Sequence, residues 1–522
     1  MGYLETEPAE VFLDQFRQLI ESEARAVANL IHPAEWLWWI RRLPDDIFAG
    51  QLASTGVYDR SLAAVLSAGS NKAALSASFR PPHPRGYVTE GTLSTVLDLA
   101  ALAVIASQSH VLLRYVGKGA RLEVREGEFP EVRPDPRISA SIRRFDSRME
   151  RSHHASLEFN FFGPAGTRTL TGVTNRDDPT VMLTAVPASR ELVDTTFGSA
   201  LLGQVEVPVK VWAEYRAVLV SAEQLATLTG EPALLGAMWW EDALPSLLVF
   251  LRTMWLAVPY MTGGLPGLYR TGYTVADPQR LRDLLGRAVT EVSSAVEAVL
   301  PGARIGGADE VWDQVLGLKG ESWPLAPGPV LRRAGHLVLV DLASAGERLR
   351  RMLNISPSGG GSLANVRGRH FEIVVQEIID RSQWKPAPGL AALRGRTLRA
   401  CNGSAVTDID AVGEYDRTLL LVNAKSYPLT SLYDAGQYGA VQNVAQRVVE
   451  DCESWTRKLE IFRANPRGKN YDFQEYREII GVVCTPFPCW VPAGSATLPV
   501  AAGLYAASSA AELERWLHCM AS

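Results

Sequence analysis

A chain of 522 residues is long for one hydrophobic core, so we expect two to four domains. Hydrophobic residues make up 47% and charged residues 21% of the chain, the composition of an ordinary soluble globular protein. The net charge of −5 excludes a globally basic coat, so any nucleic-acid site must be local.

The sequence also predicts a cytoplasmic protein that does not span a membrane. The opening MGYLETEPAE is acidic and has no apolar core, so we expect no signal peptide. The five cysteines lie in the last quarter of the chain without a CxxC spacing, which favours reduced thiols over zinc ligands. Two apolar stretches, 93–113 and 244–261, contain Asp98 and Arg252, and a charge in mid-span is costly, so we expect buried helices.

In chain order, the patterns predict a multidomain α+β N-terminal region followed by a separate C-terminal domain. Residues 1–105 are predicted to be helical, and residues 106–221 β-rich, with HASLEFNFF and TRTLTGVT pairing as a hairpin. Residues 222–353 return to helical spacing, clearest in LRDLLGRAVTEVSSAVEAVL. NISPSGGGSLAN, 354–365, is rich in Ser and Gly and predicts a flexible linker before the domain 366–522.

The C-terminal domain opens with RGRHFEIVVQEIID, in which apolar residues recur at the spacing of an amphipathic helix. Glu372 sits at the edge of this apolar face, so it should point towards whatever the helix packs on. The apolar positions are Phe371, Val374, Val375, Ile378 and Ile379.

The stretch TDIDAVGEYDRTLLLVNAKSY predicts a hairpin with polar side chains gathered on one face. Strand alternation places Asp408 and Asp410 on one face, and Asn423 and Lys425 likewise share a face. If the chain turns at YDRT, Asp410 lies opposite Asn423 and Asp408 lies opposite Lys425. A register slip of one residue would scatter the four side chains.

An acidic pair, an amide and a lysine together suit phosphodiester hydrolysis. Carboxylates bind Mg²⁺, which favours hard oxygen ligands and can polarise a phosphoryl oxygen and activate a water. A lysine can stabilise the charge that develops on the phosphate or help to orient the water. The plainer alternative is a salt bridge between Asp408 and Lys425 on a solvated hairpin.

The order of elements in the tail resembles the PD-(D/E)xK nuclease superfamily, close to its resolvase, Mrr-type and nuclease-related-domain branches. A helix with Glu372, a strand with Asp410, and a strand ending in Asn423-Ala424-Lys425 carry the resemblance, together with a long helix from 432 to 462 and the strand REIIGVVC. The resemblance covers roughly residues 362–490 and implies an α/β restriction-endonuclease-like domain with an αβββαβ core.

The resemblance assigns roles to individual residues. Asp410 is similar to the family's metal-binding aspartate, Lys425 to its catalytic lysine, and Glu372 to the helix glutamate of several branches. The backbone carbonyl of Ala424 is expected to face the metal, as the middle residue of the motif does in the family.

Asn423 departs from the family, which usually has Asp or Glu at this position, although some branches carry an amide. Asn can donate an oxygen to a metal but no charge, so the affinity for Mg²⁺ should fall. Either Asp408 restores the lost charge as a further metal ligand, or the site is catalytically inactive and kept for binding.

The resemblance implies a metal-dependent DNA endonuclease that uses Mg²⁺ or Mn²⁺, in bacterial defence or DNA processing. The N-terminal region would sense, target or oligomerise, and a homodimer would allow two strands to be cut. The alternatives are an inactive nuclease-fold module that binds nucleic acid or protein, and an unrelated α/β protein. Local positive charge would contact DNA phosphates. The candidate contacts are Arg394, Arg396, Arg399 and Gln437, with Lys385, Arg369, Arg467 and Lys469 as further candidates.

Overall fold

The computed structural model shows a mixed α/β protein with several small sheets, divided into two compact units. The first unit consists of Met1–Glu10, Leu112–Phe159 and Ile355–Ser522, and the second of Val11–Val111 and Asn160–Asn354. The structure describes residues 2–32, 85–88, 90–133, 136–159, 167–168, 181–187, 199–202, 205–208, 213–219, 244–260, 273–299, 305–318, 330–334, 336–342, 344–346, 348 and 362–519.

The described core of the second unit packs helices against antiparallel strands. Helix α8 (Leu244–Ala257) is almost wholly buried, and its Arg252 forms an ion pair of 2.7 Å with Glu291 on α10 (Pro278–Val299). The interpretation of this stretch as a buried helix is therefore confirmed. Around it lie α11 (Ala308–Gly317), β5 (Thr167–Arg168), β6 (Val181–Pro187), β9 (Ala213–Leu219), β10 (Tyr273–Ala276), β11 (Leu331–Ala334) and β12 (Leu337–Asp341).

Two long helices, α1 (Thr6–Ala28) and α4 (Glu90–Val116), cross the division between the units. Within α4, Leu93–Val116 is long and apolar enough to cross a membrane by length and composition, a test that core helices of soluble proteins also pass. Among the described helices no other segment meets this test. The remaining elements up to residue 260 are β1 (Gly2–Leu4), β2 (Arg85–Val88), β3 (Arg121–Val124), β4 (Glu131–Arg133), β7 (Ser199–Leu202), β8 (Val205–Pro208) and η4 (Val258–Tyr260).

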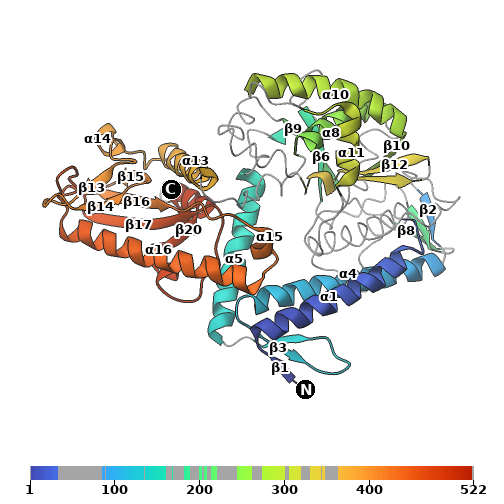
Figure 1. The fold of residues 1–522 in the computed structure, drawn as a ribbon, viewed down its shortest axis with the longest axis horizontal. Helices are drawn as coiled ribbons and strands as arrows, with labels where there is room; N and C mark the ends of the chain where they lie inside the picture. The colour runs from blue at the N-terminus through green and yellow to red at the C-terminus, as the bar shows by residue number, and fades with distance from the viewer. Residues whose placement is uncertain are drawn as a thin grey trace. The chain divides into compact units, whose positions relative to one another are not determined.

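The first unit is built on a four-stranded sheet in the order β15-β16-β17-β20. β15 and β16 are antiparallel, whereas β16, β17 and β20 are parallel. Helices α13 and α17 cover one face of the sheet and the long helix α16 runs along the other (Figure 1). The bounds are β15 (Ala411–Tyr415), β16 (Thr418–Ala424), β17 (Glu478–Thr485), β20 (Ala507–Ser509), α13 (Ser362–Asp380), α16 (Tyr438–Ala464) and α17 (Ala510–Cys519).

The apolar run LLLV is explained by burial on both faces of the sheet. Leu419 and Leu421 pack towards α16, while Leu420 and Val422 pack towards α13 and α17. A central strand that is covered on both sides is continuously hydrophobic rather than alternating. The helices α13 and α16, the strand β17 and the hairpin register, from Tyr415↔Thr418 to Ala411↔Val422, confirm the predicted elements.

The hairpin departs from its prediction beyond Ala411. β14 (Ala405–Asp408) pairs with β13 (Thr397–Arg399) in a separate two-stranded sheet, in which Asp408 lies opposite Thr397. The prediction that Asp408 lies opposite Lys425 is therefore wrong. The chain leaves one ladder for the other at Ile409, whose side chain is fully buried, so β14 does not continue beside β16.

The predicted hairpin around HASLEFNFF is also wrong, because HASLEF belongs to helix α5 (Pro136–Phe159). A short apolar alternation is compatible with either period, and here it continues a helix whose Ile142 and Phe145 are buried. The residues after Phe159 in that hairpin include a stretch outside the described residues.

The division at Asn354 falls at the start of the predicted linker, and residues 351–361 lie outside the described residues. Helix α13 begins at Ser362, so the last four residues of that linker are helical. The smaller elements of the first unit are α14 (Pro388–Ala391), α15 (Ser431–Asp434), η5 (Ser495–Thr497), β18 (Pro499–Ala501) and β19 (Leu504–Tyr505).

Candidate active site

Asp410 is held at the point where β15 begins and β16 ends. Its Oδ2 accepts a hydrogen bond of 2.7 Å from the backbone N–H of Ala424. Carried one step beyond the last pair, the register of β15 and β16 places Asp410 opposite Asn423, as the sequence predicted. A backbone hydrogen bond therefore fixes this carboxylate at the strand end.

Asn423 and Lys425 lie on the side of the sheet that faces α16, because they continue the alternation of Leu419 and Leu421. The side chain of Asn423 is buried. The N–H of Lys425 donates to the carbonyl of Cys484 at 2.8 Å, which fixes its backbone to β17. The lysine therefore extends from a firmly anchored strand end.

Glu372 on α13 interacts electrostatically with this strand end. Burial raises the pKa of Glu372, the charge of Asp410 raises it further, and Arg369 and Lys425 oppose the rise. The charges of Asp410 and Lys425 therefore both act on Glu372. The structure adds that the negative charge of Asp410 disfavours the ionised form of Glu372.

The pKa of Asp410 is also raised, first by its burial. The hydrogen bond from Ala424 and the charge of Lys425 oppose this rise, whereas the exposed Asp408 contributes to it. Asp408 therefore acts on the site as a neighbouring negative charge from the other ladder. Lys458 on α16 is a further cation that stabilises the Asp410 carboxylate.

Sequence reasoning missed three residues beside Lys425 and Asp410. Asp451 Oδ1 on α16 lies 3.6 Å from Lys425 Nζ, and the hydroxyl of Tyr427 donates to Asp451 Oδ2. Asp451 and Lys458 are two helical turns apart and so lie on the same side of α16. An acid and a base seven residues apart on the predicted long helix are the sequence signal that could have identified this pair.

Gln437 does not join this site. It is the exposed N-cap residue of α16, and Asp451 follows it by about four turns, roughly 20 Å along the helix. If Gln437 contacts a nucleic acid, it does so at a distance from the candidate site around Asp410 and Lys425.

The predicted arginine contacts have different environments. Arg394 donates two hydrogen bonds, of 2.9 and 3.2 Å, to the carboxylate of Asp380, which occupies much of its guanidinium. Arg396 and Arg399 are exposed on and before β13, and Arg399 donates to the carbonyl of Gly403 at 3.0 Å. The guanidinium groups of Arg396 and Arg399 thus remain accessible to a ligand.

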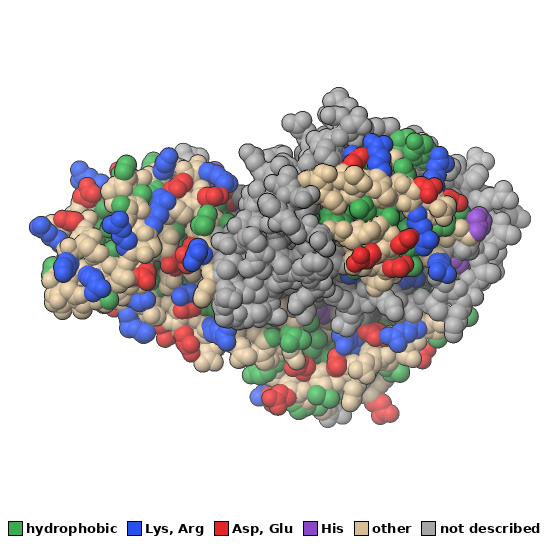
Figure 2. Space-filling model, turned by 45° about the horizontal axis from the view of Figure 1, so that its top comes forward, with side chains coloured by type: hydrophobic (Ala, Val, Ile, Leu, Met, Phe, Trp, Pro, Cys, Tyr) green, Lys and Arg blue, Asp and Glu red, His purple; other side chains and the backbone are tan. Residues whose placement is uncertain are grey.

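The further basic candidates, Lys385, Arg369, Arg467 and Lys469, are also exposed. Arg467 lies 3.8 Å from Asp472. On the face drawn in Figure 2, the Lys and Arg side chains of the C-terminal part, on the left, are interspersed with Asp and Glu. This pattern favours contacts at separate basic points over one continuous basic patch.

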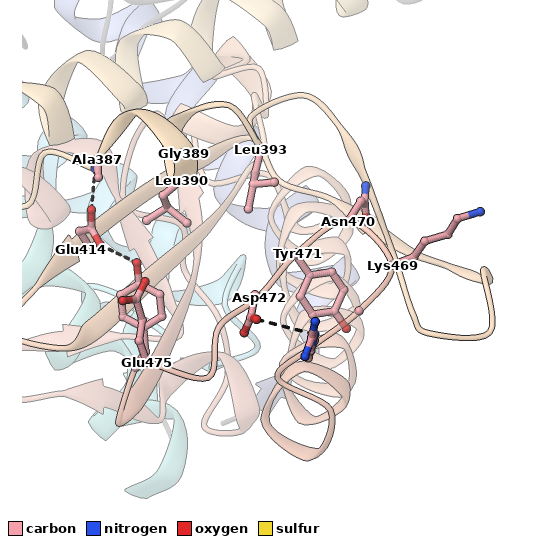
Figure 3. Close-up of a pocket in the computed structure, with 13 residues that line it drawn as sticks. Ala387, Gly389, Leu390, Leu393, Glu414, Lys469, Asn470, Tyr471, Asp472 and Glu475 are labelled. Atoms are coloured by element: carbon pink, nitrogen blue, oxygen red, sulfur yellow. Dashed lines mark hydrogen bonds and ion pairs between the residues drawn. The ribbon is translucent and has the colours of Figure 1, made fainter.

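A cavity of about 510 Å³ lies at the other end of the same sheet, near the turn between β15 and β16. Glu414 on its wall accepts hydrogen bonds from the N–H of Ala387 and the hydroxyl of Tyr476, and Lys469 points away from it (Figure 3). Because each oxygen of Glu414 already has a donor, this carboxylate is structural. The cavity is lined by Ala387, Gly389, Leu390, Leu393, Glu414, Arg467, Gly468, Lys469, Asn470, Tyr471, Asp472, Glu475 and Tyr476.

The atoms near Asp410 that could bind a metal ion are all oxygens. Within the described part of the chain no group of three or more His, Cys, Asp or Glu is placed to hold a metal ion. Asp410 and Glu372 provide two carboxylates whose charged forms are disfavoured by burial, a cost that a cation would relieve, and Asn423 offers an amide oxygen. This set fits a hard cation such as Mg²⁺ that keeps several waters, and not an all-protein cage.

The chain was also compared with known proteins. No family model, no curated protein and no solved structure matches it. The functional argument therefore depends on the residues and geometry of the chain itself.

Proposed function

We propose that the first unit is a metal-dependent endonuclease that hydrolyses phosphodiester bonds in DNA. The observation that carries the proposal is the hydrogen bond from the N–H of Ala424 to Asp410, which places this carboxylate beside the strand end that bears Asn423 and Lys425. The electrostatic effect of Asp410 on Glu372 of α13 supports the inclusion of this glutamate in the proposed centre. These are the residues expected of a PD-(D/E)xK-like centre.

The order of elements supports a restriction-endonuclease-like α/β domain. Helix α13 is followed by β13, by the interrupted strand β14–β15, by β16, by the long helix α16 and by β17. The last two main strands are parallel and α16 connects them. This is the order of an αβββαβ core, with its second strand broken at Ile409-Asp410.

The carboxylates of Asp410 and Glu372 would hold the cation, together with the amide oxygen of Asn423 and the carbonyl of Ala424. A bound Mg²⁺ or Mn²⁺ supplies a Lewis acid for the phosphoryl oxygen and lowers the pKa of water. Lys425 stabilises the negative charge that develops on the phosphate.

Asn423 lowers the negative charge of the centre by one relative to the expected pattern. Asp408 compensates by its field, because its charge acts on Asp410 although it does not face Lys425. We expect weak binding of Mg²⁺ and a higher affinity in Asn423→Asp. Loss of cleavage in Asp408→Ala would show that its charge is needed.

The decisive experiment is cleavage of supercoiled, linear and single-stranded DNA by the full chain in Mg²⁺, Mn²⁺ or EDTA. Metal-dependent cleavage that Lys425→Ala abolishes supports the proposal. Arg381→Ala removes an exposed cation of the same unit that is not among the proposed DNA contacts, and is the control. A DNA-binding shift without cleavage in any metal would favour the inactive, binding module, for which the neutral and buried Asn423 is the structural argument.

The remaining parts of the proposal concern the setting of this activity. We place the enzyme in the cytoplasm, in bacterial defence or DNA processing, with the second unit sensing, targeting or oligomerising. Pairing of two chains would bring two centres to the two DNA strands. Binding through Arg396, Arg399 and other accessible cations predicts that DNA affinity falls as salt rises, and a flat salt response would contradict it.

A further inference from the structure

Asp451 on α16 and Tyr427 after β16 lie near Lys425 and have no role in the proposed catalytic centre. Resting on the proposed function, we infer that Asp451, supported by Tyr427, is the positioning residue that orients the ammonium group of Lys425. The juxtaposition of an anion with the catalytic lysine, backed by a buried phenol, carries the inference.

The two oxygens of Asp451 have separate partners. Oδ1 lies 3.6 Å from Lys425 Nζ, and Oδ2 accepts a hydrogen bond from the hydroxyl of Tyr427. The carboxylate is therefore held from one side by the phenol while its other oxygen is presented to the lysine. A carboxylate with one fixed oxygen defines a direction for the ammonium group.

Tyr427 is itself firmly placed. Its side chain is buried in the core between the sheet and α16. Its N–H donates to the carbonyl of Lys425 at 2.9 Å, which makes a tight turn directly after the lysine. Burial and the hydrogen bond to Asp451 raise the pKa of Tyr427, so the phenol stays protonated and acts as the donor.

Helix α16 fixes Asp451 from the other direction. Its neighbours Val448, Cys452 and Trp455 are buried against the sheet. Two turns further along, Lys458 stabilises the carboxylate of Asp410. One helix therefore supplies an anion for the lysine and a cation for the aspartate.

The length of the contact leaves Lys425 available for its substrate. Close charge-assisted hydrogen bonds measure about 2.7–2.9 Å, whereas the separation here is 3.6 Å and about a third of each side chain is exposed. Asp451 thus restricts the flexible four-carbon stem of Lys425 without occupying the ammonium fully. A phosphate that enters the site can take up the remaining donors.

The test compares Asp451→Asn, Asp451→Glu and Tyr427→Phe, with Glu453→Gln as control, since Glu453 is exposed on the same helix. We expect Asp451→Asn to lower kcat for DNA cleavage roughly 10–100-fold, as for other residues that orient a catalytic group, with KM little changed. Asp451→Glu should recover part of the rate, and Tyr427→Phe should show a smaller loss. Thermal unfolding of each variant excludes a folding defect.

A second readout does not depend on cleavage. The rate at which an amine-reactive ester labels Lys425, followed at one pH by peptide mass spectrometry, should rise several-fold in Asp451→Asn and not in Glu453→Gln. An unchanged labelling rate would overturn the inference. A raised labelling rate in a protein that cleaves no DNA would support the positioning of Lys425 while rejecting the proposed function.

Discussion

Two ion pairs of the first unit differ in burial and in the completeness of their hydrogen bonds. Arg148 on α5 donates through Nε and Nη2 to both carboxylate oxygens of Glu512 on α17, at 2.7 and 2.8 Å, and through Nη2 to the carbonyl of Ala507 at 2.9 Å. Its side chain is 4% exposed and that of Glu512 is 11% exposed. Lys425 and Asp451 are separated by 3.6 Å and are 36% and 30% exposed.

The carboxylates of Glu512 and Asp410 differ in how far their partners offset the cost of burial. Burial by itself would raise the pKa of Glu512, but the hydrogen bonds and charge of Arg148, together with Ser509, hold it below its ordinary value. Burial outweighs the partners of Asp410, and its pKa is raised. The Arg148–Glu512 pair is completed within the protein, whereas the proposed centre would require a cation and a phosphate to complete it.

The largest effect on activity is expected at Asp410, whose partners do not offset its burial. Asp410→Asn keeps an oxygen that can accept from the N–H of Ala424 but removes the charge that would hold the cation. We predict that single-turnover cleavage falls by about 10²-fold or more, the scale reported by removal of one group that stabilises transition-state charge. A rate within severalfold of the wild type would move the centre away from Asp410.

The completed pair should dominate stability. Arg148→Ala leaves the carboxylate of Glu512 buried without its main partner, which costs about 3–5 kcal/mol in comparable pairs. Denaturant unfolding measures this change. Arg381→Ala is the control, because its ion pair with Glu377 is exposed and such pairs contribute about 0–1 kcal/mol. Equal losses of unfolding free energy in the two variants would show that the buried pair stabilises the fold no more than the exposed pair.

Acid should weaken the same pair. Because the folded pKa of Glu512 lies below its ordinary value of 4.5, its stabilisation is fully present above that value. The stabilisation is lost as pH falls through the folded pKa, when the carboxylate is protonated. The difference in unfolding free energy between wild type and Glu512→Gln should therefore be constant near neutral pH and shrink below pH 4.5. A constant difference down to strong acid would contradict this assignment.

The smallest effect on stability is expected at Asp451. Its contact with Lys425 is long and partly exposed, so its loss in Asp451→Asn should cost about 1 kcal/mol or less. Equilibrium unfolding in denaturant checks this value. A loss as large as that of Arg148→Ala would make Asp451 a structural residue and weaken its assignment to Lys425.

Local patterns in the sequence determined the main elements of the C-terminal domain. The apolar spacing of α13, the apolar runs of β16 and β17, and the turn at Asp416-Arg417 follow from neighbours a few residues apart. A hairpin register depends on its turn and on strand alternation, both of which are local. For this reason the placement of Asp410 opposite Asn423, with Lys425 on the same face as Asn423, could be predicted.

Contacts between distant segments were decided only by the tertiary structure. Asp408 lies on a strand that pairs with β13 instead of β16. Arg394 forms an ion pair with Asp380, and Lys425 forms one with Asp451 on α16. The joining of Leu112–Phe159 to the C-terminal tail belongs to the same class. Periodicity reports which face of an element is buried, but the partner on that face is chosen by the packing of the whole unit.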